Sequence, residues 1–270
     1  MGGNAITAPS LAHAYTHSGP RLHYVMAGSG RPVLLLHGFP EFWFGWRHQI
    51  EPLAAAGYRV IAPDQRGYDL SDKPASVRAY RIDDLAADVL RLADEVAPGE
   101  KVSLVGHDWG AGVAWWLAIH APERLERLAI LNAPHPAVFM RALKTNPRQW
   151  LRSWYILFLQ VPGLPEWLLS RGDYRGMARS LQASSRPGTF TAAELARYRE
   201  AWGQPGALTA SINWYRAAMR YRVHLRRSPR VVVPTLILWG VRDVALGREL
   251  VEPSRALCDD GRLVCFEQAT

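Results

Sequence analysis

Short apolar runs alternate with amphipathic segments along the first half of the chain. Five runs rich in β-branched and aliphatic residues predict strands. Between them, apolar residues three and four positions apart predict helices at Trp46–Ala56 and Ile82–Val96. Alternation of this kind predicts an α/β fold with a mainly parallel sheet flanked by helices. The predicted strands are Leu22–Met26, Val33–Leu36, Arg59–Ala62, Val102–Val105 and Leu128–Leu131.

The pattern changes after Pro134. A segment rich in Trp, Tyr and Arg, compatible with helices, continues to Pro229, and strand character then returns at Val231–Trp239 and Leu263–Phe266. A helical segment between two strands of one sheet is an insertion rather than a separate domain. We therefore expect an α/β core from residues 1–136 and 231–270, with a helical cap of residues 137–230 inserted in it.

Charge is distributed unevenly along the chain. The net charge is +8, but residues 137–230 contain 16 Lys or Arg against 4 Asp or Glu. Arg171, Arg175 and Arg179 follow one another at helical spacing, which favours a solvated helix face, and no nucleic-acid-binding motif accompanies them. We therefore expect no nucleic-acid partner.

Composition predicts an ordinary globular protein. With 270 residues and 49% hydrophobic content, the chain can bury a sizeable core. No apolar run reaches membrane-spanning length and residues 1–20 do not resemble a signal peptide, so we expect a cytoplasmic location and no membrane partner. Cys258 and Cys265 have no metal-ligand companions nearby, and we expect both to be reduced, with no metal and no cofactor.

The stretch Gly106-His107-Asp108-Trp109-Gly110 has the pattern of a nucleophile elbow. An apolar strand leads into it, a helix-like segment from Ala111 to His120 follows it, and glycines stand two residues before and two after Asp108. The sharp turn requires small residues at those two positions. The helix N-terminus favours negative charge there, so Asp108 is expected to be an ionised nucleophile.

Aspartate in place of the usual serine selects the substrate. A serine that attacks a saturated carbon becomes an ether, whereas a carboxylate becomes an ester, which an activated water can cleave through a tetrahedral oxyanion. The substrate is therefore expected to be an epoxide or an alkyl halide. The alternative interpretation is that Asp108 merely caps the helix.

Two further segments supply the expected partners of Asp108. The strand Val33–Leu36 breaks at His37-Gly38-Phe39-Pro40, which places the backbone amide of Phe39 beside that of Trp109 as the two oxyanion-hole donors. His37 is expected to support this turn by hydrogen bonds. Asp243, in a loop after the penultimate strand, is the candidate residue that orients a catalytic histidine, with a surface aspartate as the alternative.

These residues resemble the α/β-hydrolase-fold epoxide hydrolases over nearly the whole chain. The resemblance lies in His37-Gly38-Phe39-Pro40-Glu41, Trp46-Arg47-His48-Gln49, Asp64-Gln65-Arg66-Gly67-Tyr68, Ser71-Asp72-Lys73-Pro74, the elbow, and Asn213-Trp214-Tyr215-Arg216. In that family two cap tyrosines hold the epoxide oxygen, and the resemblance places them at Tyr155 and Tyr215. A phenol can protonate the alkoxide that ring opening generates. The alternative for either tyrosine is packing within the cap.

The chain departs from the family pattern at two points. Asp69 stands where the family usually has glycine. The family's base is a histidine after the last strand, but none of the nine histidines follows Asp243, and the last of them is His224. We expect a truncation just before this base, so that the 270-residue chain forms the Asp108 ester but hydrolyses it very slowly.

The expected function is an epoxide hydrolase that produces a vicinal diol, with a role in detoxification. A haloalkane dehalogenase would share Asp108 and Trp109, and a non-catalytic binding protein of the same fold would account for the missing base. A histidine immediately beyond Thr270 in the full gene would remove the support for the binding protein. The small-molecule epoxide is expected to be apolar or aromatic, because the cap contains Trp150, Trp154, Trp167, Trp202 and Trp214.

Overall fold

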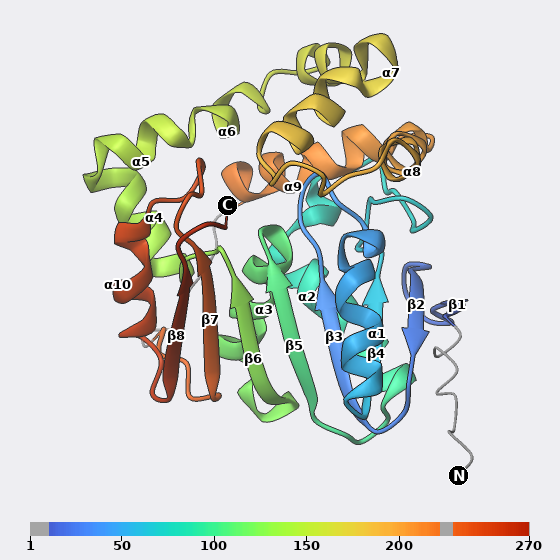
Figure 1. The fold of residues 1–270 in the computed structure, drawn as a ribbon, viewed down its shortest axis with the longest axis vertical. Helices are drawn as coiled ribbons and strands as arrows, with labels where there is room; N and C mark the ends of the chain where they lie inside the picture. The colour runs from blue at the N-terminus through green and yellow to red at the C-terminus, as the bar shows by residue number, and fades with distance from the viewer. Residues whose placement is uncertain (1–10, 222–228, 270) are drawn as a thin grey trace.

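A single eight-stranded sheet forms the centre of the protein. The computed structural model describes residues 11–221 and 229–269. The strand order is β1-β2-β4-β3-β5-β6-β7-β8, and pairing is parallel from β4 through β8 and antiparallel at β1 and β2 (Figure 1). The mainly parallel sheet is therefore confirmed. The strands are β1 (Ala12–Tyr15), β2 (His23–Ala27), β3 (Arg31–Leu36), β4 (Tyr58–Pro63), β5 (Val102–His107), β6 (Leu125–Leu131), β7 (Thr235–Gly240) and β8 (Gly261–Phe266).

Two strands differ from the sequence prediction. β1 is not predicted because its sequence has no apolar run: it is an edge strand whose side chains are exposed or half-buried. The strand predicted from Val231 begins only at Thr235, and Val231 itself makes an isolated bridge with Cys258. Pro234 explains the shorter strand, because proline has no backbone N–H to donate to a neighbouring strand.

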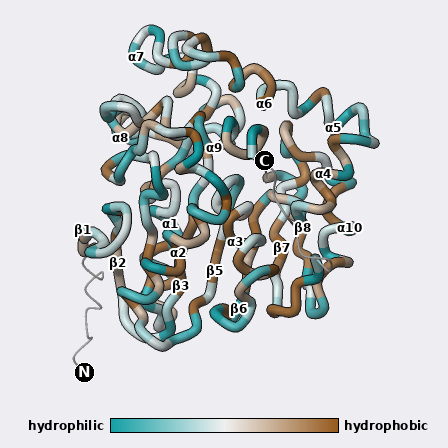
Figure 2. Tube along the Cα trace, turned by 180° about the vertical axis from the view of Figure 1, so that it is seen from behind, coloured by the Kyte–Doolittle hydropathy of each residue, from teal (hydrophilic) through white to brown (hydrophobic). Residues whose placement is uncertain are grey.

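Alternate residues of the strands pack on opposite faces of the sheet. Leu34 and Leu36 of β3 belong to one buried cluster, and Val33 and Leu35 belong to the other. Helices α2 (Ile82–Val96) and α3 (Trp109–His120) cover the first face, and α1 (Arg47–Ala55) lies on the second (Figure 1). Hydrophobic residues are concentrated along the central strands (Figure 2).

Short helices complete the core. The 3-10 helices are η1 (Trp43–Trp46), η2 (Val77–Tyr80), η3 (Pro122–Arg124) and η4 (Arg248–Leu250), and α10 (Val251–Arg255) precedes the last strand. The helix predicted at Trp46–Ala56 thus begins one residue later, after η1. Among the described residues, no helix is both long enough and apolar enough to cross a membrane.

Among the described residues, six helices lie between β6 and β7, and we call them the cap. They are α4 (Pro136–Thr145), α5 (Pro147–Arg152), α6 (Trp154–Phe158), α7 (Leu164–Ala183), α8 (Ala192–Gly203) and α9 (Ala207–Arg220). Figure 1 shows them beyond one end of the sheet. The helical character predicted for this segment is present, while its exact limits as an inserted unit stay a prediction, since residues 222–228 lie outside the described residues.

The arginines predicted to share one helix face do not do so. Helix α7 is kinked, with non-helical backbone from Arg171 to Tyr174, so Arg171 lies at the kink while Arg175 and Arg179 follow it. Gly172 adopts a positive φ of 58° there, a conformation that glycine tolerates without a steric penalty. All three arginines are exposed, as expected for solvated side chains.

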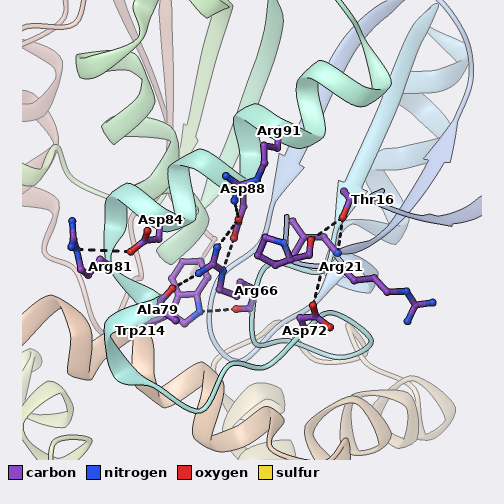
Figure 3. Close-up of polar contacts among 12 residues, drawn as sticks. Thr16, Arg21, Arg66, Asp72, Ala79, Arg81, Asp84, Asp88, Arg91 and Trp214 are labelled. Atoms are coloured by element: carbon purple, nitrogen blue, oxygen red, sulfur yellow. Dashed lines mark hydrogen bonds and ion pairs between the residues drawn. The ribbon is translucent and has the colours of Figure 1, made fainter. Parts of the chain in front are cut away.

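A buried arginine connects the core to the cap. The Arg66 guanidinium donates to both carboxylate oxygens of Asp88 on α2, at 2.7 and 2.6 Å, and to the carbonyl of Ala79 (Figure 3). The carbonyl of Arg66 accepts a 2.9 Å hydrogen bond from the Trp214 indole of α9. Burial raises the pKa of Asp88, and Arg66 and Arg91 act against that shift. The ion pair thus fixes the loop after β4 between α2 and the cap.

We predict that Asp88→Asn destabilises the protein by about 3 kcal/mol, because it leaves the buried Arg66 charge without its counter-ion. Urea unfolding followed by circular dichroism measures the difference. The matched control is Asp84→Asn on the same helix, whose carboxylate is about half exposed beside Arg81 and should contribute less than about 0.5 kcal/mol. Equal effects of the two substitutions would contradict a structural role for the Arg66–Asp88 pair.

Candidate active site

Asp108 occupies the predicted turn between a strand and a helix. β5 ends at His107, α3 begins at Trp109, and Asp108 between them has a positive φ of 52°. A Cβ at Gly106 would collide with the backbone of Ala111, and one at Gly110 with the backbone of Leu36 and His37. The two glycines are therefore required by close backbone approach, as the elbow pattern predicts.

The carboxylate of Asp108 faces the turn after β3. The backbone N–H of Phe39 donates to Asp108 Oδ1 at 2.8 Å, and Asp108 makes no side-chain cap hydrogen bond to α3. A Cβ on Gly38 would lie against the same carboxylate, so only glycine allows this approach. The side chain is therefore placed over the end of the sheet, and the interpretation of Asp108 as a simple helix cap does not fit its geometry.

Opposing influences act on the charge of Asp108. Desolvation raises its pKa, and the nearby Asp243 carboxylate acts in the same direction. His107 and the backbone amides of Phe39 and Trp109 oppose this shift by stabilising the carboxylate. The Phe39 amide donates directly to the Asp108 carboxylate, and the role of the Phe39 and Trp109 amides as oxyanion donors stays a prediction.

His37 supports the turn, as expected. Its Nε2 accepts from the backbone N–H of Gln65 at 3.0 Å, so its Nδ1 carries the proton and donates to the carbonyl of Gly38 at 3.0 Å. Burial lowers the pKa of His37 to about 4, which keeps the ring neutral. The ring therefore joins the turn after β3 to the loop after β4.

Both cap tyrosines lie close to Asp108. The rings of Tyr155 on α6 and Tyr215 on α9 meet edge to face, with centroids 5.9 Å apart. Tyr215 also contacts the rings of Phe39 and Trp109, at 5.6 and 5.0 Å. Burial and the charge of Asp108 raise the pKa of both phenols well above the usual value, so each keeps a proton that it can donate.

The neighbours of Tyr215 hold it in place. Trp214 is buried and bonded to the Arg66 carbonyl, while Arg216 donates to the carbonyls of Leu159 and Val161 and forms an ion pair with Glu166 at 2.6 Å. Three successive residues of α9 therefore contact the core, the candidate site and the segment after α6, in that order. Arg216 also fixes the chain just beyond Tyr155.

Asp243 is held by a residue that the sequence reasoning missed. Its Oδ1 accepts from the backbone N–H groups of Ala245 and Leu246, and its Oδ2 accepts from Asn132 Nδ2 at 2.7 Å. Asn132 follows β6 with a positive φ of 43°, and its Oδ1 accepts from the Gly240 N–H. The sequence signal for Asn132 is an asparagine directly after a predicted strand, because Asn tolerates the positive φ of a sharp turn better than most residues.

The histidines near the site make other contacts. His107 Nδ1 lies 3.9 Å from Glu41 Oε2, and His135 caps α4 through Nδ1 and bonds to the Pro229 carbonyl through Nε2. Within residues 11–221 and 229–269, no histidine is hydrogen-bonded to Asp243. His224 lies outside the described residues.

The five cap tryptophans do not share one environment. Trp202 and Trp214 are buried in the core clusters, whereas Trp150, Trp154 and Trp167 are 52%, 61% and 56% exposed. In the described part of the chain, the rings that contact Tyr215 are those of Phe39, Trp109 and Tyr155. The aromatic character of the candidate site therefore comes mainly from the core turns and the two tyrosines.

Asp69 adds a second carboxyl group to a buried polar cluster beside the site. His23 is hydrogen-bonded to Asp64 at 2.6 Å and to His13 at 2.9 Å. One ring nitrogen of His23 and one carboxyl oxygen each of Asp64 and Asp69 all lie within 4.8 Å of one another. Asp69 has a positive φ of 38°, the conformation for which glycine is favoured. Burial raises the pKa of both Asp64 and Asp69 to about 7, and their mutual interaction adds to the shift at Asp69. The pair therefore retains a proton near neutral pH.

The sheet, the elbow after β5 and the loop aspartate after β7 define a hydrolase of the α/β class, and comparison with known proteins agrees. Residues 31–269 match the alpha/beta hydrolase fold family. The chain is 46% identical over 255 residues to the AB hydrolase superfamily protein YfhM of Bacillus subtilis, covering 94% of this chain and 88% of that protein. It is 40% identical to Epoxide hydrolase 4 of Mus musculus, covering 92% and 71%.

Solved structures give the same result. An epoxide hydrolase from Bacillus megaterium superposes with a TM-score of 0.87 at 30% identity, over 95% of this chain and 92% of that chain. An epoxide hydrolase recovered from metagenomes of hot environments superposes with a TM-score of 0.81 at 34% identity, over 95% and 90%. The chain belongs to the α/β-hydrolase fold family, in the branch that contains the epoxide hydrolases.

We predict that the Asp64–Asp69 pair makes stability fall as the pH rises. The folded pKa of about 7 lies above the ordinary unfolded value of about 4, so the folded state binds the proton more tightly. The resulting stabilisation is full below about pH 4 and is lost as the pH rises through 7. Asp69→Asn should flatten the decline in melting temperature between pH 5 and 8.

The matched control for this prediction is Asp260→Asn, at an exposed position. It should leave the pH dependence of the melting temperature as in the unmodified protein. Parallel melting curves for all three proteins between pH 5 and 8 would show that the pair does not share a proton.

Proposed function

We propose that the chain is an epoxide hydrolase that uses Asp108 as its nucleophile and produces a vicinal diol. One observation carries the proposal: a carboxylate that accepts a backbone N–H from Phe39 is faced by two protonated phenols, Tyr155 and Tyr215. Several relatives with substantial identity are named epoxide hydrolases, including those of mouse and human. Residues 137–230 are proposed to act as a cap over this site.

Ring opening is the first proposed step. A carboxylate oxygen of Asp108 attacks a ring carbon, the bond from that carbon to the epoxide oxygen breaks, and its electron pair stays on the oxygen. A proton from Tyr155 or Tyr215 neutralises the developing alkoxide. The products of the step are an ester of Asp108, a hydroxyl group on the neighbouring carbon and a tyrosinate, which later regains a proton from water.

Hydrolysis of the ester is the second proposed step. Water attacks the ester carbonyl of Asp108, and the amides of Phe39 and Trp109 stabilise the tetrahedral oxyanion. Collapse of this intermediate breaks the bond between the Asp108 carbonyl carbon and the alkoxy oxygen, and that oxygen takes up the proton that the attacking water loses to the base, so the diol is released. The step requires a base oriented by Asp243, whose carboxylate is held by Asn132 and by the backbone N–H groups of Ala245 and Leu246.

The proposed substrate is an apolar or aromatic epoxide. The surroundings of the two phenols include the rings of Phe39 and Trp109, which would pack against an apolar substituent. A structural neighbour, a mutant epoxide hydrolase from Bacillus megaterium with a TM-score of 0.87, was solved with its product, a naphthyloxy-propanediol. That pairing supports an aryl-substituted epoxide for this chain.

A haloalkane dehalogenase remains the second candidate for the nucleophile, since an alkyl halide also forms an ester with a carboxylate. The phenols favour the epoxide. An alkoxide requires a proton, whereas a departing halide requires none, and both Tyr155 and Tyr215 are placed with raised pKa beside Asp108.

We predict that the 270-residue chain gains the mass of one substrate molecule when it is treated with styrene oxide, and that peptide mapping places the addition on Asp108. Asp108→Asn should abolish the addition, because the neutral amide is a poor nucleophile. Intact-protein mass spectrometry makes the measurement, with Asp260→Asn as the control that should still react. No adduct, or an adduct at another residue, would refute the mechanism.

We predict that Tyr215→Phe and Tyr155→Phe each slow formation of the styrene oxide ester, by about a hundredfold for the more important donor. The same variants should react with a bromoalkane, if at all, at the rate of the unmodified chain, because bromide leaves without a proton. Single-turnover mass spectrometry compares the two substrates. Equal loss on both substrates would assign the tyrosines to packing, and rapid bromide release by the unmodified chain would favour the dehalogenase.

A further inference from the structure

Exposed hydrophobic side chains are concentrated on one part of the cap. Sixteen large hydrophobic residues are exposed in the described part of the chain, and nine of them lie between Met140 and Leu168. All three exposed tryptophans belong to this group. We call this set the outer cap surface: Met140, Trp150, Leu151, Trp154, Leu157, Val161, Leu164, Trp167 and Leu168. Its helices α5, α6 and the start of α7 lie along the side of the cap that faces away from the sheet (Figures 1 and 2).

Helices α5 and α6 have an apolar exposed face. Trp150, Trp154 and Leu157 follow at intervals of four and three, which places them on one face of the nearly continuous helical segment 147–158. Gln149 and Ser153 point inward instead, where Gln149 donates to Ser153 at 3.0 Å and to the carbonyl of Ala245 at 2.8 Å. A water-exposed helix usually has the reverse arrangement. The outer face is therefore suited to contact with an apolar phase.

The first turn of α7 continues the surface, again with residues three and four positions apart. Leu164, Trp167 and Leu168 occur at intervals of three and one, and the guanidinium of Arg171 stacks on the Trp167 ring at 4.6 Å. A tryptophan beneath an arginine combines an apolar body with a charged rim, and this pairing is favoured at the boundary between lipid headgroups and acyl chains.

Basic side chains alternate with the apolar ones along this segment, and few acidic groups oppose them. Arg152 lies 4.0 Å from Glu249, in an exposed ion pair. Seven Arg or Lys side chains between positions 140 and 180 are exposed. The two acidic residues of that interval are already engaged, Glu166 with Arg216 and Asp173 with Arg199. The exposed basic residues are Arg141, Lys144, Arg148, Arg152, Arg171, Arg175 and Arg179. The surface therefore has a positive potential, which attracts anions and repels an identical surface.

We propose that the outer cap surface docks the protein on anionic phospholipid bilayers. Exposed Trp and Leu side chains enter the interfacial region while Arg and Lys contact anionic headgroups, the combination by which peripheral helices bind lipid. A second copy of the chain fits poorly, because it would bring two basic surfaces together. This docking departs from the expectation of no membrane partner, which considered only membrane-spanning segments and the N-terminus.

Docking has a consequence for the candidate site, which, unlike the docking itself, rests on the proposed function. Helix α6 carries Trp154 on its exposed face and Tyr155 toward Asp108. A docked cap brings the proposed epoxide site next to the phase in which apolar epoxides dissolve. Vesicle binding can be measured without any substrate, so failure of docking and failure of the epoxide chemistry are separate results.

Flotation with vesicles tests the proposal. The chain should float with vesicles of phosphatidylcholine containing phosphatidylglycerol, bind vesicles of phosphatidylcholine alone at least about tenfold more weakly, and dissociate in high salt. Trp150→Ser combined with Trp167→Ser should reduce vesicle binding about tenfold or more, because apolar contact is lost. Arg148→Glu combined with Arg171→Glu should reduce vesicle binding by a similar factor, because the charge is reversed. Far-ultraviolet circular dichroism confirms that each variant is folded.

Matched controls lie outside the outer cap surface. Met219→Ser with Val232→Ser removes exposed apolar side chains elsewhere, and Arg31→Glu with Arg78→Glu reverses exposed charges elsewhere. The Arg31→Glu, Arg78→Glu pair changes the net charge as much as the Arg148→Glu, Arg171→Glu pair does. The proposal therefore requires that vesicle binding falls more in the cap pair than in the control pair. Absence of vesicle binding, or equal losses in cap and control variants, overturns the proposal. If the chain does not bind vesicles but sediments as a dimer, and the Trp variants sediment as monomers, the surface is an interface with a second copy of the chain.

Discussion

The contact between the turn after β3 and the turn after β5 is the constraint on which the candidate site depends. Two neighbouring parallel strands end side by side, and the Phe39 N–H reaches the Asp108 carboxylate at 2.8 Å. Any side chain at Gly38 or Gly110 would separate the two turns. The contact therefore rests on the absence of side chains, and the rest of the site is arranged around it: His37 supports one turn and α3 begins at the other.

Helix α9 relates the cap to this contact. Trp214 is bonded to the loop after β4, Tyr215 stands over the two turns, and Arg216 is bonded to the segment after α6. The loop after β4 is in turn joined to α2 by Arg66 and to the turn after β3 by Gln65 and His37. Hydrogen bonds thus connect helix α2 of the core to Trp214, and Arg216 to the segment after α6, so the residues on both sides of Tyr215 are held by buried polar contacts.

The sequence predicts most of the sheet because runs of apolar and β-branched residues are local signals. The elbow at Asp108 and the glycine-containing turn at Gly38 are equally local, so their positions follow from spacing alone. The Asn132–Asp243 hydrogen bond could not be predicted this way, since it joins residues 111 positions apart through the relative placement of β6 and β7. The same holds for the Asp64–Asp69 pair, which depends on how one loop folds back, and for Trp150 and Trp154, whose helical spacing is compatible with either a buried or an exposed face.

The bonds of Arg216 determine how the two tyrosines relate to each other. Its guanidinium fixes the Leu159 and Val161 carbonyls, a few residues beyond Tyr155, while its own backbone adjoins Tyr215. The helices that carry the two phenols are therefore joined through Arg216, and the two rings meet edge to face with centroids 5.9 Å apart. In the proposed mechanism, this arrangement would define where the epoxide oxygen sits and leave the remainder of the substrate unconstrained. Under that proposal, variation in the surrounding helices would change which epoxides are accepted without changing the point at which the ring is opened.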